Sequence, residues 1–400
     1  MRDETKIVVA GRDPAKQHGV VNPPVYHAST VIHPTLDALD AAQAARARDE
    51  QVTVYGRSGT PTSFAFENAV AALEGGYRSF AVPSGLAAVT VAMLSSLKSG
   101  DHVLMVDTVY GPTRKLCEGF LRKMGIETTY YLPEIGADIA GLMRPNTKVV
   151  YVEAPGSLTF EMQDIPAIAG AAKARGATVI CDNTWASPLY FKPFEKGVDI
   201  SVQAATKYIV GHSDAMLGTV TATKEAWTRV RDTGRELGYA VGPDDLYLGQ
   251  RGFRTLAVRL AQHWKTGVEL AIWLRARPEV IRVMHPALPD DPGHAIWKRD
   301  FHGASGLFAI EIEPTPRPAL AAMMDHLEFF GMGYSWGGYE SLMIWAHPDH
   351  FRTARPWDAN RTVLRIHAGL ENIEDLKADL TAGFERRAAA LKGTKAAAAE

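Results

Sequence analysis

The 400-residue chain has only two cysteines, Cys117 and Cys181, far apart in the sequence. Two are too few for a disulfide framework, and neither lies in a cluster of the kind that binds a metal. No run reaches the roughly 18 apolar residues that a membrane-spanning helix needs. The first residues, MRDETKIVVAGRD, also lack the apolar segment of a signal peptide. We therefore expect a soluble cytoplasmic protein without structural disulfides, metal ligands or a membrane span.

The chain also lacks a large excess of either positive or negative charge. The chain has 43 basic and 45 acidic residues, for a formal net charge of -2, and no basic tract stands out. The charge balance therefore gives no reason to expect binding to a nucleic acid or to a membrane surface. Hydrophobic residues make up 46% of the chain, which excludes disorder as the overall state. A chain of 400 residues is long enough for two packed domains.

The sequence pattern changes near residue 60. Residues 1–60 are irregular, and the prolines of NPPVYHAST indicate an extended arm, followed by a short helix within 36–50. Runs rich in Val, Ile and Tyr then alternate with amphipathic helical segments, and they predict strands at 79–82, 102–106, 148–153, 177–182 and 198–203. This alternation predicts an α/β domain over 61–255, with a mainly parallel sheet covered by helices on both faces. Ligands of such sheets bind beyond the carboxyl ends of the strands.

A second pattern begins near residue 250. Apolar residues at three- and four-residue spacing predict one long helix over 251–280. A strand at 306–313, a glycine-rich loop containing GMGYSWGGYE, and a last strand within TVLRIHAGL follow. Strands and helices in this order predict a smaller α+β domain over 256–400.

Residues suited to one ligand follow successive predicted strands of the large domain. They are Ser84-Gly85-Leu86 at a helix start, Tyr110 in a turn, Asp182 at a strand end, and Thr206-Lys207. Each has an ordinary structural explanation, such as a helix cap, a packed ring or a surface lysine stem. Pyridoxal phosphate accounts for all of them together, because it offers a phosphate to a helix start, a ring nitrogen to a carboxylate and an aldehyde to an amine.

Longer motifs carry a resemblance to a known family. ATKYIVGHSDAMLGT, VEAPGSLTFEMQDIPAI, YSWGGYESL and RIHAGLENIEDL resemble the Cys/Met metabolism family of pyridoxal-phosphate enzymes, and within it the cystathionine β-lyases. The resemblance covers about residues 5 to 390. It implies the fold of type I aminotransferases and a homotetramer of two close dimers that share active sites. It also implies cleavage of a C–S bond of L-cystathionine, which yields L-homocysteine, pyruvate and ammonia in methionine biosynthesis.

The resemblance also implies roles for individual residues. Lys207 would bind the cofactor's aldehyde, Asp182 would pair with the ring nitrogen, and Tyr110 would stack on the ring. Others would bind the phosphate, namely Ser84, Gly85, Leu86 and Thr206, with Tyr55 and Arg57 from the neighbouring subunit. Arg365 would bind the substrate carboxylate in a pocket lined by Ser335 and Trp336.

Two departures and three alternatives qualify this interpretation. Ala204 stands where many relatives have a phosphate-binding serine, so we expect more dependence on Thr206 and the partner's Arg57. Residues 156–159 read GSLT in place of Ser-Asn-Pro, which favours the β-lyase branch.

A broader cysteine-S-conjugate β-lyase or cysteine desulfhydrase would use the same residues. A non-catalytic relative is disfavoured by the intact Lys207, Asp182 and Arg365, and an NAD-dependent oxidoreductase by the absence of GxGxxG after the first strand.

Overall fold

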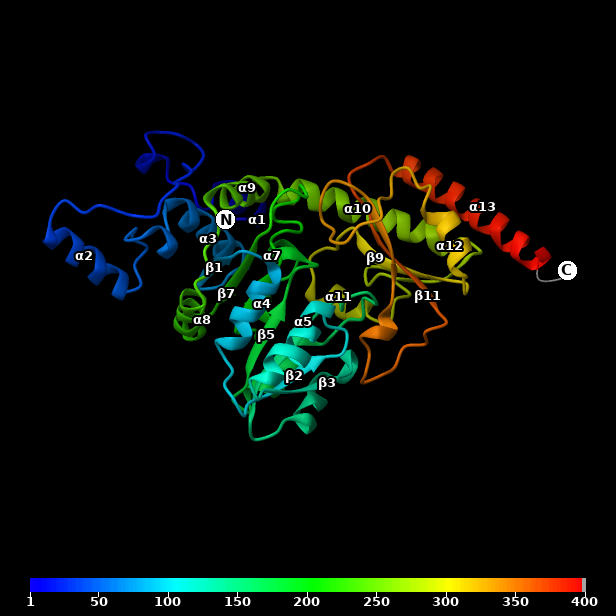
Figure 1. Cartoon of the computed structure of the whole chain (residues 1–400), viewed down its shortest axis with the longest axis horizontal. Helices are drawn as coiled ribbons and strands as arrows, with labels where there is room; N and C mark the ends of the chain where they lie inside the picture. Colours follow the sequence, from blue (N-terminus) through cyan, green and yellow to red (C-terminus); the bar gives the residue numbers. More distant parts are fainter. Residues whose placement is uncertain (398–400) are drawn as a thin grey trace.

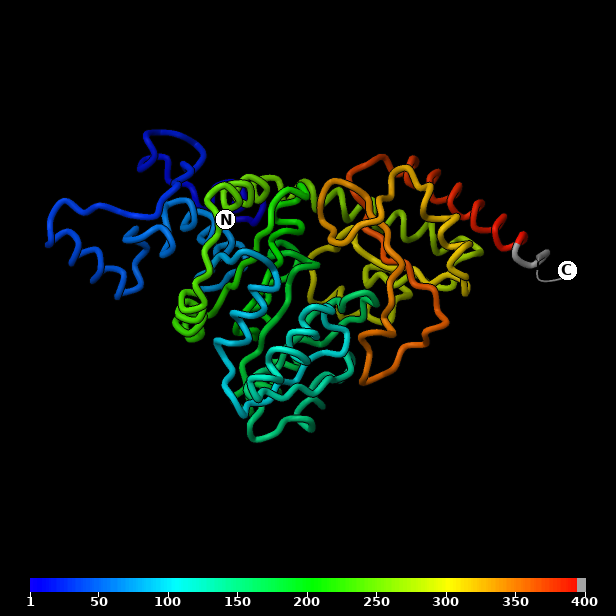
Figure 2. The backbone as a smooth tube through the Cα atoms, viewed as in Figure 1, coloured from blue at the N-terminus to red at the C-terminus, as the bar shows by residue number. Residues whose placement is uncertain are grey.

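The computed structural model describes residues 1–397, and it contains two β-sheets with helices around them (Figure 1). The larger sheet is built from strands within residues 78–222 and the smaller sheet from strands within residues 280–367. Figure 2 shows the same path as a tube, with the N-terminal segment extending from one end of the molecule and the last helix at the other.

The large sheet has seven strands in the order β1-β7-β6-β5-β4-β2-β3. Their bounds are β1 Arg78–Val82, β2 His102–Val106, β3 Glu127–Tyr131, β4 Thr147–Glu153, β5 Thr178–Asp182, β6 Ile200–Gln203 and β7 Gly218–Ala222. All neighbouring pairs are parallel except the two that involve β7. The mainly parallel sheet and its five predicted strands are confirmed, whereas β3 and β7 were not predicted.

The small sheet is antiparallel, with four strands in the order β10-β11-β9-β8. The strands are β8 Val280–Met284, β9 Leu307–Ile312, β10 Leu342–Ala346 and β11 Thr362–His367. A separate apolar cluster joins β9 and β11 to the helices beside them. The α+β character of the C-terminal part is thus confirmed, and β8 and β10 are additions to the prediction.

The α-helices vary from one turn to 25 residues. They are α1 Asp3–Val9, α2 Leu36–Ala47, α3 Pro61–Glu74, α4 Gly85–Leu94, α5 Gly111–Leu116, α6 Ile165–Lys173, α7 Ser187–Tyr190, α8 Lys224–Glu236, α9 Pro243–Arg254, α10 Leu256–Arg275, α11 His294–Asp300, α12 Arg317–Met324 and α13 Ile373–Ala397. Within residues 1–397, no helix is both long and apolar enough to cross a membrane.

The single helix predicted over 251–280 is wrong. The chain has two helices there, because the backbone leaves helical geometry at Thr255, between α9 and α10. The first turn of α10 packs beside the large sheet through Leu256 and Leu260, and its last turns pack in the core of the small sheet through Leu270 and Leu274. Helix α10 therefore connects the two cores, and the predicted boundary at residue 255 stays a prediction.

Residues 1–60 divide into two parts. Helix α1 packs on its own chain, with Ile7 fully buried beside Phe66 and Leu260. The segment that contains α2 extends away from the rest of the chain (Figure 1). It carries exposed apolar side chains, and Ile32 and Leu36 are 90% and 78% exposed.

A buried carboxylate joins the two parts of the chain. Asp107, at the end of β2, is fully buried and accepts hydrogen bonds from Arg114 of α5 at 2.6 Å and from Arg352 at 3.0 Å. The backbone N–H of Thr353 adds a third at 3.0 Å. Burial by itself would raise the pKa of Asp107, but the hydrogen bonds from residues 352–354 lower it overall. Asp107 therefore stays ionised and holds the segment after β10 against the large sheet.

We expect Asp107→Asn to lower the free energy of unfolding by roughly 3–5 kcal/mol, because it removes the fully buried counter-charge of two guanidinium groups. Within residues 1–397, Arg114 and Arg352 would keep only their ion pairs with the more exposed Glu118 and Glu161. Urea denaturation at neutral pH, where the carboxylate is ionised, measures the loss. The matched control is Asp138→Asn, which changes an exposed aspartate and should shift the midpoint very little. Equal shifts for the two variants would contradict this account of Asp107.

Candidate active site

Four groups of predicted site residues lie at one edge of the large sheet. Strands β1, β2, β5 and β6 run in the same direction, so their carboxyl ends meet at this edge. Ser84–Leu86, Tyr110, Asp182 and Thr206–Lys207 lie at or directly after these ends. The loop after residue 331 and strand β11 add Ser335, Trp336 and Arg365 from the small sheet's side.

Lys207 lies between the two sheets. Its Nζ donates a hydrogen bond to the Ser335 Oγ at 2.6 Å and lies 5.3 Å from the centre of the Trp336 ring. Burial and the nearby Arg365 lower the pKa of Lys207 to about 8, although Asp182 opposes this shift. The neutral, nucleophilic form of this amine is therefore much more populated near neutral pH than that of an ordinary lysine.

Glycine allows the loop to approach Lys207. Gly337 has a φ of +88°, and a Cβ there would lie 2.9 Å from the backbone of Lys207 and Tyr208. Any other residue would be strained at this φ and would push the loop away. The close approach is what brings Ser335 within hydrogen-bond distance of the amine.

Asp182 is the last residue of β5, and only one of its two carboxylate oxygens forms hydrogen bonds within residues 1–397. Its Oδ1 accepts hydrogen bonds from the backbone and the hydroxyl of Thr184, at 3.0 and 2.5 Å. Its Oδ2 has no hydrogen bond to any residue in 1–397. Burial raises the pKa of Asp182, which Thr184 and Lys207 partly offset. A partly buried carboxylate with a free oxygen is suited to a cationic partner.

Glu153 is a site residue that the sequence analysis missed. It lies beside Asp182 in the register of β4 and β5, and its Oε2 accepts a hydrogen bond from the backbone N–H of Tyr110 at 2.9 Å. Burial and the neighbouring Asp182 hold the pKa of Glu153 well above its usual range. A glutamate at the end of a predicted buried strand could have marked Glu153 as a candidate site residue. Its contact with the Tyr110 turn joins residues far apart in the chain, so the sequence pattern does not show it.

The start of α4 is open to an anion. Ser84 caps the helix, with its Oγ accepting a hydrogen bond from Ala87 N at 3.1 Å, as predicted. The N–H groups of Gly85 and Leu86 have no acceptor within residues 1–397. A Cβ at Gly85 would lie 2.5 Å from that of Ala204, so glycine is needed where the helix meets the end of β6.

Thr206 is arranged differently from the expectation. Its Oγ1 accepts a hydrogen bond from Leu217 N at 2.9 Å and lies 3.1 Å from the carbonyl oxygen of the same residue. The hydroxyl is thus engaged by its own chain's backbone at the start of β7. A direct role in binding phosphate stays a prediction.

Arg365 on β11 is a partly buried guanidinium without an acidic partner in the described part of the chain. Its Nη2 donates to the Ser335 carbonyl oxygen at 2.9 Å, and burial lowers the pKa of Arg365 to about 10. A positive charge held in this way can accept a carboxylate from outside the protein. Ser335, with a φ of +80°, contacts both Arg365 and Lys207.

His367 is the second residue that the sequence analysis missed as part of the site. Its Nε2 accepts a hydrogen bond from Gly337 N at 3.1 Å, and its Nδ1 lies 3.1 Å from the Glu340 carbonyl oxygen. This pattern requires a neutral imidazole with its proton on Nδ1. Burial lowers the pKa of His367 well below its usual value, so the ring holds the 337–340 loop in place at neutral pH.

Comparison with known proteins identifies the family. The profile of the Cys/Met metabolism PLP-dependent enzymes matches residues 4–385. The chain belongs to this family. It is 43% identical to cystathionine β-lyase MetC of Escherichia coli over 96% of this chain and 98% of the relative. It is 39% identical to an L-alanine/L-glutamate racemase of Wolbachia pipientis wMel over 96% of this chain and 98% of the relative.

A solved structure supports the same assignment. The cystathionine γ-synthase of Xanthomonas oryzae pv. oryzae, in complex with aminoacrylate and cysteine, aligns with a TM-score of 0.88 at 30% identity, covering 98% of this chain and 99% of that one. The type I aminotransferase-like fold of PLP-dependent enzymes is thereby confirmed, and so is pyridoxal phosphate as the cofactor.

The site's donor set fits this cofactor. The amine of Lys207 suits an aldehyde, the free Oδ2 of Asp182 suits a protonated pyridine nitrogen, and the open start of α4 suits a phosphate. Gly85 has no side chain at this helix start, and a Cβ there would lie 2.5 Å from that of Ala204. These groups come from β1, β5 and β6, whose ends lie at the same edge of the sheet.

Tyr55 and Arg57 do not join this site within one chain. They line a separate cavity of about 310 Å³ together with Arg78, Arg231 and Arg235, and Lys207 is not among its lining residues. The Arg57 side chain is exposed and donates to the Arg235 carbonyl oxygen at 3.2 Å. Their predicted contribution to a neighbouring subunit's phosphate stays a prediction.

In protein freed of cofactor, we expect acylation of Lys207 to rise through pH of about 8, because the neutral amine is the reactive form. Arg365→Leu should raise this apparent pKa by removing a nearby positive charge, and Asp182→Asn should lower it by removing a negative one. Mass spectrometry of the Lys207 peptide across a pH series measures both shifts.

The exposed Lys148 provides the internal control in the same samples, and its profile should be the same in all three proteins. A Lys207 profile that both substitutions leave unchanged would show that the electrostatic account of this amine is wrong.

Proposed function

We propose that the chain is a PLP-dependent carbon–sulfur β-lyase that cleaves L-cystathionine to L-homocysteine, pyruvate and ammonia. The observation that carries the proposal is the arrangement around Ser335. Its hydroxyl accepts a hydrogen bond from the amine of Lys207, and its carbonyl oxygen accepts one from Arg365, which has no acidic partner within residues 1–397. A proton-transferring amine and a receptor for an α-carboxylate are thereby held by one residue.

The remaining residues suit the binding of the cofactor. When bound, pyridoxal phosphate supplies an aldehyde for the substrate's amino group and a ring that accepts the electron pair released at Cα. Asp182 would keep a proton on the ring nitrogen, and Tyr110, which is 43% exposed at the sheet edge, would stack on the ring. Gly85 and Leu86 would donate backbone N–H groups to the phosphate, beside Ser84 and Thr206.

Two side chains would act on the substrate. Arg365 would bind the α-carboxylate, with Ser335 and Trp336 lining the pocket, and would thereby fix the direction of the Cα–H bond. Lys207 would take the Cα proton as general base and return a proton to the departing sulfur as general acid. The C–S bond breaks, the thiol leaves, and hydrolysis of the remaining three-carbon fragment yields pyruvate and ammonia.

A second reaction follows from the same residues. If Lys207 removes the Cα proton and a second proton donor on the opposite face of Cα replaces it, the product is the D-amino acid. The relative from Wolbachia is named a racemase. A broader cysteine-S-conjugate β-lyase or cysteine desulfhydrase is the other alternative within elimination chemistry. The higher identity to the E. coli β-lyase and the GSLT sequence at 156–159 support cystathionine cleavage.

We expect the purified protein with pyridoxal phosphate to be yellow and to release thiol and pyruvate in equal amounts from L-cystathionine. Lys207→Ala should lose nearly all turnover and the borohydride-stable attachment of the cofactor, whereas the exposed-site control Lys148→Ala should retain both. A thiol reagent, a pyruvate assay and peptide mass spectrometry provide the measurements.

The products distinguish the alternatives. D-alanine formed from L-alanine without pyruvate would favour the racemase, and faster turnover of L-cysteine or other S-conjugates would favour the broader lyase. A protein that does not bind pyridoxal phosphate at all would overturn the proposal.

We also propose a homotetramer of two close dimers, in which Tyr55 and Arg57 complete the neighbouring subunit's site. The extended segment with exposed Ile32 and Leu36 supports an arm that packs on another subunit, because apolar side chains so exposed favour burial. The exposed, forked cation of Arg57 is suited to phosphate. Closed symmetry would make the exchange reciprocal.

Arg57→Ala and Lys207→Ala should each be nearly inactive alone. Unfolded and refolded together, they should regain about a quarter of wild-type activity, because half of the random dimers are mixed and one of their two sites is intact. Refolded wild type sets the reference. No recovery in the mixture, with active refolded wild type, would place each site within one chain.

A further inference from the structure

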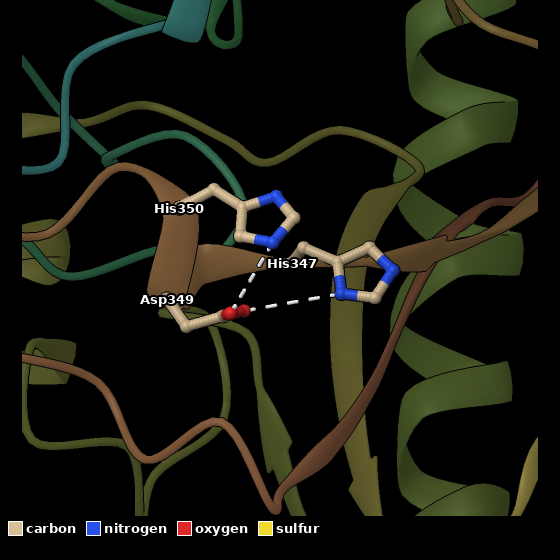
Figure 3. A group of neighbouring side chains, drawn as sticks. All are labelled: His347, Asp349 and His350. Carbon is tan, nitrogen blue, oxygen red and sulfur yellow. Dashed lines mark ion pairs between the residues drawn. The ribbon is translucent and has the colours of Figure 1, made fainter.

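Three side chains outside the active site converge at the end of β10. His347 follows the strand, and Asp349 and His350 lie on the short 3₁₀ turn η6, Pro348–His350. His347 Nδ1 lies 3.9 Å from Asp349 Oδ1, and His350 Nε2 lies 3.4 Å from Asp349 Oδ2. Figure 3 shows the carboxylate below both rings, with dashed lines that mark its ion pair with one nitrogen of each ring. The mechanism proposed above uses none of the three.

These donor atoms are free of other partners. Within residues 1–397, no ring nitrogen of the two histidines and no oxygen of the Asp349 carboxylate forms a hydrogen bond to a residue outside the cluster. One ligand atom from each residue lies within 4.8 Å of the other two. In tetrahedral coordination at zinc distances, two ligand atoms lie about 3.3 Å apart. The 3.4 Å between His350 Nε2 and Asp349 Oδ2 is close to this value. His347 Nδ1 lies 3.9 Å from the other oxygen, Oδ1, so its side chain would have to rotate toward the shared cation.

The surroundings restrict these side chains. The two imidazoles are stacked, with centres 5.0 Å apart and planes inclined by 11°. The His347 ring also packs against Trp345 at 4.5 Å. Pro348 is buried and limits the backbone between the first two ligands. Because the lone pair of an imidazole nitrogen lies in the plane of its ring, one of the two rings would have to turn out of this stack for both to bind the same cation.

We propose that His347, Asp349 and His350 bind a divalent transition-metal cation such as Zn²⁺, with solvent completing the coordination. Two imidazoles and one carboxylate carry at most one negative charge and are the ligand types that zinc accepts. Magnesium, which prefers oxygen ligands, should bind poorly. This assignment differs from the sequence-based expectation of no metal site, which considered other histidines and not the His-Pro-Asp-His run.

The site also has a structural connection to the proposed active site. Phe351 follows the ligands, and a Cβ at Gly111, beside Tyr110, would lie 2.9 Å from its ring. The next residue, Arg352, binds the buried Asp107. A cation would therefore tether the start of the segment that rests on the Tyr110 turn.

The test is a titration of the PLP-loaded full chain with Zn²⁺ in competition with a chromogenic chelator. We expect one zinc per chain at this site, and at least a tenfold loss of its affinity in each of His347→Ala, His350→Ala and the near-isosteric Asp349→Asn. His326→Ala, which changes an exposed histidine elsewhere, is the matched control and should bind zinc as the wild type does. Excess Mg²⁺ should not displace the zinc.

A second measurement guards against variants that fold poorly. Zinc should raise the thermal midpoint of the wild type and of His326→Ala, because a ligand that binds the folded state stabilises it, and it should leave that of Asp349→Asn unchanged. Unchanged zinc affinity in the three cluster variants, an equal loss in His326→Ala, or displacement by Mg²⁺ would overturn the proposal.

Discussion

The buried charge of Asp107 sets how the two sheets meet. A carboxylate without solvent must be neutralised by fixed partners, and here Arg114 comes from the large sheet's side while Arg352 comes from the segment after β10. Because both guanidinium groups must reach the same two oxygens, the small sheet has little freedom to slide. This constraint places β11 and the 331–340 loop above the strand ends that carry Lys207 and Asp182.

The active-site geometry then follows from close backbone approach. Gly337 lies against the turn of Lys207, and His367 holds the loop by two hydrogen bonds as a neutral ring. Ser335 is thereby held in a strained conformation between Lys207 and Arg365. Packing forces outweigh local backbone preference here, as is common where a site must be held rigid. The result is an amine near a positive charge, which favours its neutral form.

The charges of the site and of the N-terminal segment have different explanations. Within residues 1–397, Arg365 has no acidic partner and the Oδ2 of Asp182 has no hydrogen bond, and a substrate and a cofactor of the proposed chemistry would supply the missing partners. The side chains of Ile32 and Leu36 are mostly exposed, and a second chain would cover them. Partly buried charges without a counter-charge and exposed apolar side chains both indicate what a protein binds, because each raises the free energy of the unbound protein.

The sequence by itself determined the class of sheet, five of its strands, the residues at the strand ends and the family. These features depend on local patterns and on contiguous motifs, which a sequence contains directly. The edge strand β3, with its threonines, and the antiparallel β7 were missed because their stability comes from pairing with distant strands. The break at Thr255 was missed because apolar spacing continues through it. Only the tertiary structure decided that Glu153 and His367 support the site, that Thr206 binds Leu217, and that Arg57 lies in another cavity, since each of these depends on contacts between residues far apart in the chain.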